Sequence, residues 1–192
     1  DEYNVGGLLG YRFDSLSTLD VEYRYYDGTF GTGTKIYLDD GAFDRYRSHL
    51  INAGYAATLG KYKVNARAYM QIENFDREKE SISGNSGKYK MSDNNHIKHD
   101  NGVWFNISRL FFKNHRFTSG FELKMGDMDA EEIYRTSTDV IDYGGKLNFA
   151  GLFLQDEFKL FRKLSVIAGL RFDYATYYDG YQNVINPTSN TG

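Results

Sequence analysis

The sequence predicts an all-β membrane protein: an antiparallel transmembrane β-barrel wall of about eight strands, arranged as four hairpins. Three observations lead to this prediction. Apolar and polar residues alternate with a period of two along most of the chain. The alternating runs are about 10–13 residues long, enough for a tilted strand to cross a bilayer. Short turns join the runs at one end and long polar segments at the other, as in outer-membrane barrels.

The composition fits such a protein and excludes several other classes. The 192 residues include 17 Tyr and 14 Phe but no Cys, and the formal net charge is -3. The mean hydropathy of -0.59 is compatible with a barrel, because only every second strand residue must be apolar. No apolar run reaches the roughly 18 residues of a transmembrane helix. The absence of Cys excludes disulfides and thiolate sites, and the absence of a basic patch argues against nucleic-acid binding.

The first two hairpins are predicted at the N-terminal end of the chain. Residues 3–13 and 18–27 alternate around a polar turn at 14–17, with Val5 and Val21 among the apolar residues. The second hairpin pairs residues 47–59 with residues 62–74. Its turn is Gly60-Lys61, and Val64, Ala66, Ala68, Met70 and Ile72 form one face of its second strand.

The third and fourth hairpins repeat this arrangement. Residues 102–112 and 116–126 are predicted to pair around Lys113-Asn114. The last hairpin covers the stretch LFLQDEFKLFRKLSVIAGLRFDY, with a turn at Arg162-Lys163. We expect its first strand to end just before this turn and its second to run to about residue 178.

Long polar segments are predicted as loops at residues 28–45, 76–101 and 127–145 and after about residue 178. His96 and His99 lie in the second of these segments, and we interpret them as solvated loop residues rather than metal ligands. Acidic residues also gather in the predicted loops. The candidate ligand-binding residues are Asp39, Asp40, Asp127 and Asp129. Oxygen-rich loops can bind calcium, but the spacing matches no calcium-binding loop, so no metal site and no cofactor are predicted.

The last hairpin also carries a sequence motif. Phe153-Leu154-Gln155-Asp156-Glu157, followed after a turn by Gly169-Leu170-Arg171-Phe172-Asp173, resembles a hairpin of TonB-dependent outer-membrane receptors. In that family a strand of the type F-x-Q-D-E runs to the periplasm and one of the type G-x-R-[FY]-D returns. The other three hairpins agree with the family in architecture rather than in motif.

Alternation assigns the polar residues of this hairpin to the interior of the barrel. Gln155 and Glu157 share one face of their strand, and Arg171 and Asp173 share the matching face of the next. We therefore predict that these four residues face the lumen, where they can pair across strands. Asp156 has the lipid-facing parity, and we expect it at the periplasmic headgroup level, where a charge costs little.

The resemblance implies a location, a function and a set of partners. Family members are nutrient receptors of the bacterial outer membrane with a barrel of about 22 strands, a plug domain and a segment that contacts the TonB complex. We expect residues 1–192 to be a fragment of one such barrel domain, without the plug. The implied partners are outer-membrane lipid, the TonB complex through a plug absent from this chain, and an extracellular small-molecule or glycan ligand. The ligand would be a siderophore, cobalamin, a glycan or a similar nutrient.

Three other interpretations remain open from the sequence. A complete eight-stranded outer-membrane barrel with a structural or adhesion role would require residues 3–13 to pair with residues 164–178. A soluble antiparallel barrel would also alternate, although its charged face would point to solvent. An outer-membrane enzyme would need a nucleophile and a base, and no such set is found, so the chain is predicted not to be an enzyme.

Overall fold

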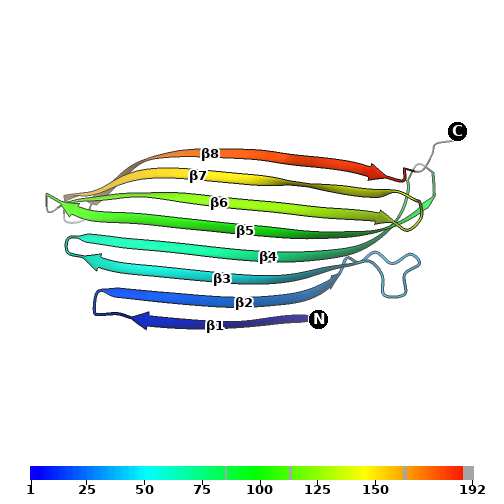
Figure 1. The fold of residues 1–192 in the computed structure, drawn as a ribbon, viewed down its shortest axis with the longest axis horizontal. Helices are drawn as coiled ribbons and strands as arrows, with labels where there is room; N and C mark the ends of the chain where they lie inside the picture. Colours follow the sequence, from blue (N-terminus) through cyan, green and yellow to red (C-terminus); the bar gives the residue numbers. More distant parts are fainter. Residues whose placement is uncertain (85, 113, 162–163, 188–192) are drawn as a thin grey trace.

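The computed structural model describes residues 1–84, 86–112, 114–161 and 164–187, and these form one antiparallel sheet of eight strands. Neighbouring strands in the sheet are also neighbours in the chain, from β1 at one edge to β8 at the other (Figure 1). The strands are β1 (Glu2–Arg12), β2 (Ser17–Gly31), β3 (Phe43–Leu59), β4 (Tyr62–Ile82), β5 (Tyr89–Phe111), β6 (His115–Tyr134), β7 (Val140–Phe161) and β8 (Leu164–Ile185). The described residues contain no helix able to cross a membrane.

The predicted hairpin order is confirmed. Short turns after β1, β3 and β5 lie at one end of the sheet, which we call the turn end, and the connections after β2, β4 and β6 lie at the other end, the loop end (Figure 1). The predicted turn residues Lys113, Arg162 and Lys163 lie outside the described residues. Within the described sheet, β1 pairs only with β2 and β8 only with β7, so the pairing that a closed eight-stranded barrel requires is not formed.

The predicted loops at the loop end are largely wrong, because most of their residues extend the strands. The connections in the structure cover only residues 32–42, 83–88 and 135–139. Residues 89–101 belong to β5, and residues 127–134 belong to β6. Sequence alternation ends where both faces of a strand meet water, but the backbone hydrogen bonds of the antiparallel ladder continue beyond that level.

The register places two sets of side chains on opposite faces of the sheet. On the apolar face, residues form rows that run across the strands. One complete row is Leu9, Val21, Ala53, Ala68, Val103, Leu123, Ala150 and Tyr174, and the next row toward the turn end is Tyr11, Leu19, Tyr55, Ala66, Phe105, Phe121, Leu152 and Phe172. The intervening residues form the polar face.

We use the term apolar band for a set of neighbouring rows on the apolar face. On β5 these rows begin with Phe111, near the turn end, and end with Asn101. These residues are ten steps apart on one strand, which is about 34 Å of strand and roughly 25 Å of height at a tilt of about 40°. This height matches the apolar belt of outer-membrane barrels. Beyond the band, the next row contains ionisable residues, among them Asp127, which is hydrogen-bonded to His99 at 2.9 Å.

Aromatic residues line the turn end of the apolar band. The guanidinium of Arg109 lies 4.5 Å from the Phe111 ring centroid and donates a hydrogen bond to Tyr62 at 2.7 Å. Asp156 lies in the row of Arg109 and Phe117, toward this end of the band, and is hydrogen-bonded to His115 at 2.8 Å. The acidic residue of the FLQDE segment that has apolar-face parity thus has a side-chain partner on β6.

The connection between β2 and β3 folds over the apolar-face side of the sheet, beyond the apolar band. The carboxylate of Glu80 on β4 accepts hydrogen bonds from the backbone amides of Ile36, Tyr37 and Leu38. Tyr89 on β5 also donates its hydroxyl proton to Glu80, at 3.2 Å. Glu80 is only 2% exposed, so one carboxylate holds the middle of this connection against the wall.

Candidate functional site

The polar face carries the four side chains that the sequence predicts to face the interior of a barrel. Alternation along β7 and β8 puts Gln155, Glu157, Arg171 and Asp173 on this face, with Gly169 opposite Gln155 and Phe153 opposite Arg171. All four residues lie on the same face of the sheet.

A chain of charged side chains crosses the polar face from β6 to β8. The Glu122 carboxylate accepts from Lys124 at 2.8 Å and from Arg171 at 2.7 Å. Arg171 also contacts Asp173 at 2.8 Å. Gly151 on β7 lies between Glu122 and Asp173, and the absence of its side chain leaves the space that Arg171 and Asp173 occupy.

The other two predicted residues lie closer to the turn end. Gln155 lines a shallow hollow with Arg171, Trp104 and Phe153. Glu157 is separate from this group and pairs with Arg116 at 3.3 Å. The four predicted polar residues therefore share a face but form two groups, and their charges are balanced by neighbours within the wall.

A larger hollow of about 530 Å³ lies on the polar face nearer to the loop end. Gly126 and Gly145 leave room there, because neither has a side chain. Around them stand Lys98, Asp100, Met128, Leu147 and Tyr177. Tyr69 donates a hydrogen bond to Asp100 at 3.0 Å at the edge of the same region. This hollow combines a cation, an anion, an aromatic ring and apolar side chains, which is the mixed lining typical of small-molecule sites.

Sequence reasoning did not find this hollow. Most of its residues lie in segments predicted as loops, where alternation no longer separates inside from outside. The sequence feature that marks the hollow is its glycine content. Gly126, Gly144, Gly145 and Gly180 lie together on three neighbouring strands, but only the register shows this. No spacing rule in the sequence reports that register.

The four predicted ligand-binding aspartates lie elsewhere. Asp39 and Asp40 belong to the connection at 32–42 and line a hollow with Arg45 and Glu78, on the apolar-face side of the sheet. They are the only two of the four that lie in a loop.

Asp127 and Asp129 lie on β6, so their predicted loop position is wrong. Both have apolar-face parity and point outward above the apolar band. Asp129 accepts a hydrogen bond from Tyr181 at 2.9 Å. Strands β4 and β5 separate this pair from the connection that carries the other two aspartates.

The two histidines of the H-x-x-H spacing also lie on a strand rather than in a loop. Because residues three apart on a strand have opposite parity, His96 and His99 face opposite sides of β5. His96 stacks on Phe75 with ring centroids 4.6 Å apart. No group of three or more potential metal ligands is found among the residues that the structure describes.

Comparison with known proteins identifies the family. The family model described as the TonB-dependent receptor-like β-barrel matches residues 2–192. The chain belongs to the TonB-dependent receptor family. The members of this family are transporters of the bacterial outer membrane, and the polar face of the sheet is thus the lumen side of an outer-membrane barrel, while the apolar band faces lipid.

Solved structures of TonB-dependent receptors have the same fold. FpvA of Pseudomonas aeruginosa, bound to heterologous pyoverdines, gives a TM-score of 0.77 at 12% identity, over 97% of this chain and 32% of its own. The ferric citrate transporter FecA gives 0.77 at 14% identity, over 96% and 31%. The ferric yersiniabactin uptake receptor FyuA of Yersinia pestis gives 0.71 at 12% identity, over 97% and 33%.

The chain spans about a third of the length of each of these receptors. At these identities the likeness concerns the fold. A search of curated protein sequences found no match.

Proposed function

We propose that this chain is part of the barrel wall of a receptor that binds a scarce nutrient outside the cell and imports it across the outer membrane. The family match over residues 2–192 carries the proposal. Siderophores come first among the candidate ligands, because the related structures are described as receptors for pyoverdine, ferric citrate and yersiniabactin. Cobalamin and glycans are the alternatives. In this proposal the chain itself has no enzymatic role.

The domain assignment is part of the same proposal. We assign residues 1–192 to a single barrel domain of a larger receptor whose plug and TonB contacts lie outside this chain. The unpaired outer edges of β1 and β8 support a wall segment over a closed eight-stranded barrel with a structural or adhesion role. Charge balance on the lumen side also supports it, since a selective open pore would be expected to have a lining biased to one charge.

Within the wall, we assign the ligand-facing role to the hollow around Lys98 and Tyr177. It lies on the lumen side and nearer to the loop end, on the route that an extracellular ligand would take. Its glycines allow a ligand to approach the backbone closely. A cation, an acid and an aromatic ring within one hollow can bind a polar organic ligand of either charge.

An uptake assay on the full receptor tests the function. A strain lacking the receptor is complemented with the intact gene and supplied with radioactive iron as ferric citrate or ferripyoverdine, or with labelled cyanocobalamin. Energy-dependent uptake of one probe, lost in a strain without TonB, is the expected result. A complemented strain that takes up none of these probes and no glycan would contradict the import proposal.

Substitutions test the site within the same assay. We expect Lys98→Ala with Tyr177→Ala to weaken binding of the transported probe by about tenfold, as the loss of two polar contacts would. The prediction that Asp39, Asp40, Asp127 and Asp129 bind the ligand is tested with two double variants, Asp39→Asn with Asp40→Asn and Asp127→Asn with Asp129→Asn. Full affinity in these two variants would reject it, and full affinity in the Lys98 and Tyr177 variant would reject the hollow.

A further inference from the structure

The hairpin of β4 and β5 extends beyond the apolar band and carries opposite charges on its two sides. Along residues 76–80 the order is Asp, Arg, Glu, Lys, Glu, so alternation sends acids to one side and bases to the other. The register continues this separation onto β5. The lumen side of residues 73–82 and 89–98 has four cations and one acid, whereas the outer side has four acids and no cation. The lumen-side residues are Glu73, Arg77, Lys79, Lys90 and Lys98, and the outer acids are Asp76, Glu78, Glu80 and Asp93.

Three of the four outer acids have partners of their own. Asp76 accepts a hydrogen bond from Arg47 at 2.8 Å, and Asp93 pairs with Arg135 at 2.5 Å. Glu80 accepts the backbone amides of the connection at 32–42. The acids on this side therefore hold parts of the wall together at its loop end.

The lumen-side lysines have no such partners. Arg77 is neutralised, because Asp44 on β3 accepts two hydrogen bonds from it at 2.7 Å. Lys79, Lys90 and Lys98 are exposed, and they form no ion pair within the part of the chain that the structure describes. Lys79 and Lys90 are diagonal neighbours on one face of the hairpin, so their ammonium groups repel each other.

The excess positive charge lies at the tip of the hairpin. Glu73 lies directly opposite Lys98 and offsets the charge of that lysine. On the lumen side of the adjacent β6, the acid at this level is Glu132, opposite Asn94. It faces three exposed lysines of the tip, which are Lys79, Lys88 and Lys90. The tip is thus positive on its lumen side, at the entrance to the barrel.

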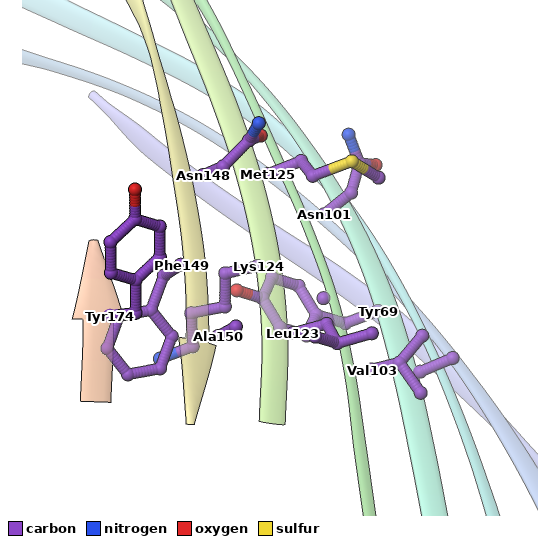
Figure 2. A pocket seen from close by; sticks show the side chains of 12 residues that line it. Tyr69, Asn101, Val103, Leu123, Lys124, Met125, Asn148, Phe149, Ala150 and Tyr174 are labelled. Atoms are coloured by element: carbon purple, nitrogen blue, oxygen red, sulfur yellow. The ribbon is translucent and has the colours of Figure 1, made fainter. Parts of the chain in front are cut away.

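Cations deeper on the lumen side are arranged differently. The ammonium nitrogen of Lys124 lies 5.6 Å from the centroid of the Phe149 ring (Figure 2) and pairs with Glu122 at 2.8 Å. The lysines of the hairpin instead lie at both ends of one path. Lys90 is at the tip, and Lys98, about 27 Å farther along the same face of β5, lines the hollow proposed to face the ligand.

We propose that Lys79, Lys88 and Lys90 capture a net-anionic ligand at the entrance to the barrel and direct it along β5 to this hollow. The inference rests on the proposed import function and narrows its ligand to molecules with several carboxylate, catecholate or phosphate groups, such as anionic ferric chelates. Cobalamin and neutral glycans gain nothing from these lysines. Long-range attraction raises the rate of capture, whereas the contacts within the hollow decide how long the ligand stays.

Binding kinetics of the purified full receptor test the inference. The probes are two anionic chelates, ferric citrate and ferric enterobactin, and cyanocobalamin, which has no net charge. Stopped-flow quenching of intrinsic fluorescence gives the association and dissociation rates at low and high salt. We expect an anionic chelate to bind with an association rate that falls steeply as salt increases. Lys79→Gln with Lys90→Gln should lower this rate about tenfold at low salt and leave the dissociation rate nearly unchanged.

Lys35→Gln with Lys61→Gln is the matched control, because it removes the same charge from the outer connection and from the turn end. Its association rate should equal that of the unaltered receptor. Equal rates in both double variants, or binding of cyanocobalamin alone, would overturn anionic capture and leave the import proposal intact. If the receptor neither binds nor takes up any probe, both proposals are overturned. Heat-modifiable migration verifies folding, which these exposed substitutions should not impair.

Discussion

Several charged residues on the lumen side are paired with one another within the wall. Arg171 is the centre of the largest group, because it contacts both Glu122 and Asp173, and Glu122 in turn contacts Lys124. The Arg171 side chain is 43% exposed, so water competes with each contact and single pairs stabilise little. The two positive and two negative charges of this group offset one another, and their contacts contribute only modestly to stability.

Arg171→Ala should therefore lower the thermal stability of the barrel slightly, by a few degrees, without preventing its assembly. The loss leaves Asp173 without this partner, whereas Glu122 keeps Lys124. The temperature at which the heat-modifiable band disappears measures the effect. Lys159→Ala, a substitution on the same face with no ion pair recorded within the described residues, is the control, and a barrel unchanged by both substitutions would contradict the prediction.

Glycine is required at some positions of the wall because a neighbouring side chain lies directly against the backbone there. A Cβ atom added to Gly120 would collide with the backbone oxygen of Phe105 and the ring of Phe153. The Phe153 ring lies over Gly120, so the position of this ring requires a residue without a side chain at position 120.

We expect Gly120→Val to destabilise the barrel by about 1–3 kcal/mol, the usual cost of overpacking. Gly10→Ala is the matched control, since an added Cβ there meets nothing within 4 Å. Urea unfolding of both variants in lipid vesicles provides the comparison. Equal midpoints would show that the wall moves to accommodate the larger residue.

At the scale of elements, the connection at 32–42 is hydrogen-bonded to the wall through the carboxylate of Glu80, beside a contact between the Tyr37 and Tyr89 rings. Burial of Glu80 by itself raises the pKa of the carboxyl, but the backbone amides of Tyr37, Ile36 and Leu38 outweigh this effect, so its pKa lies below the usual 4.5. Glu80 lies well beyond the apolar band, in the part of β4 that stands outside the bilayer. Its negative charge and its three amide donors together keep the connection folded outward, away from the lumen.

Removal of this carboxylate should release the connection. In Glu80→Ala, three amides lose their acceptor, and trypsin should cleave after the exposed Lys35 about tenfold faster than in the unaltered protein. Cleavage after Lys88, in the next connection, serves as an internal control and should not change. A protected Lys35 in Glu80→Ala would mean that other contacts hold the connection.

Acid should have the same effect in the unaltered protein. Because the folded-state pKa of Glu80 is lowered, its contribution is fully present above about pH 4.5 and is lost as the pH falls through the folded-state value. Hydrogen exchange of amides 36–38, corrected for its intrinsic pH dependence, should accelerate over that range. In Glu80→Gln, the carboxyl no longer titrates, and the acceleration should disappear.

At the scale of the whole molecule, one face of the sheet divides into an apolar band and a polar outer part. The boundary is the row that contains His99, Asp127 and Lys146. Below this row the apolar face meets lipid, and above it the same face meets water. Apolar residues such as Leu152, which is 60% exposed in the wall alone, are stabilised by the bilayer rather than by a protein core.

This boundary predicts how the barrel tolerates charge. Leu152→Lys lies in the middle of the apolar band and should cost about 2–4 kcal/mol. Ile97→Lys lies on the same face but one row beyond the boundary, and should cost about 0–1 kcal/mol. Reversible folding of the full receptor into phospholipid vesicles measures both, and equal costs would place the bilayer elsewhere on the wall.

The sequence by itself determined the all-β class, the order of the hairpins and the parity of each strand within the bilayer. These features are local: alternation appears because one face of each strand meets hydrocarbon and the other meets the lumen. The common face of Arg171 and Asp173, and the opposite face of Asp156 relative to Gln155 and Glu157, follow from counting by twos.

Only the tertiary structure decided where the strands end and which residues come together. Above the bilayer both faces meet water, so the sequence of residues 89–101 has no period although the backbone ladder continues. The Glu80 contacts to Ile36–Leu38, the hollow beside Gly126 and Gly145, and the two charged sides of the β4–β5 hairpin all depend on cross-strand register. Register is a relation between distant segments, and a pattern within one segment does not contain it.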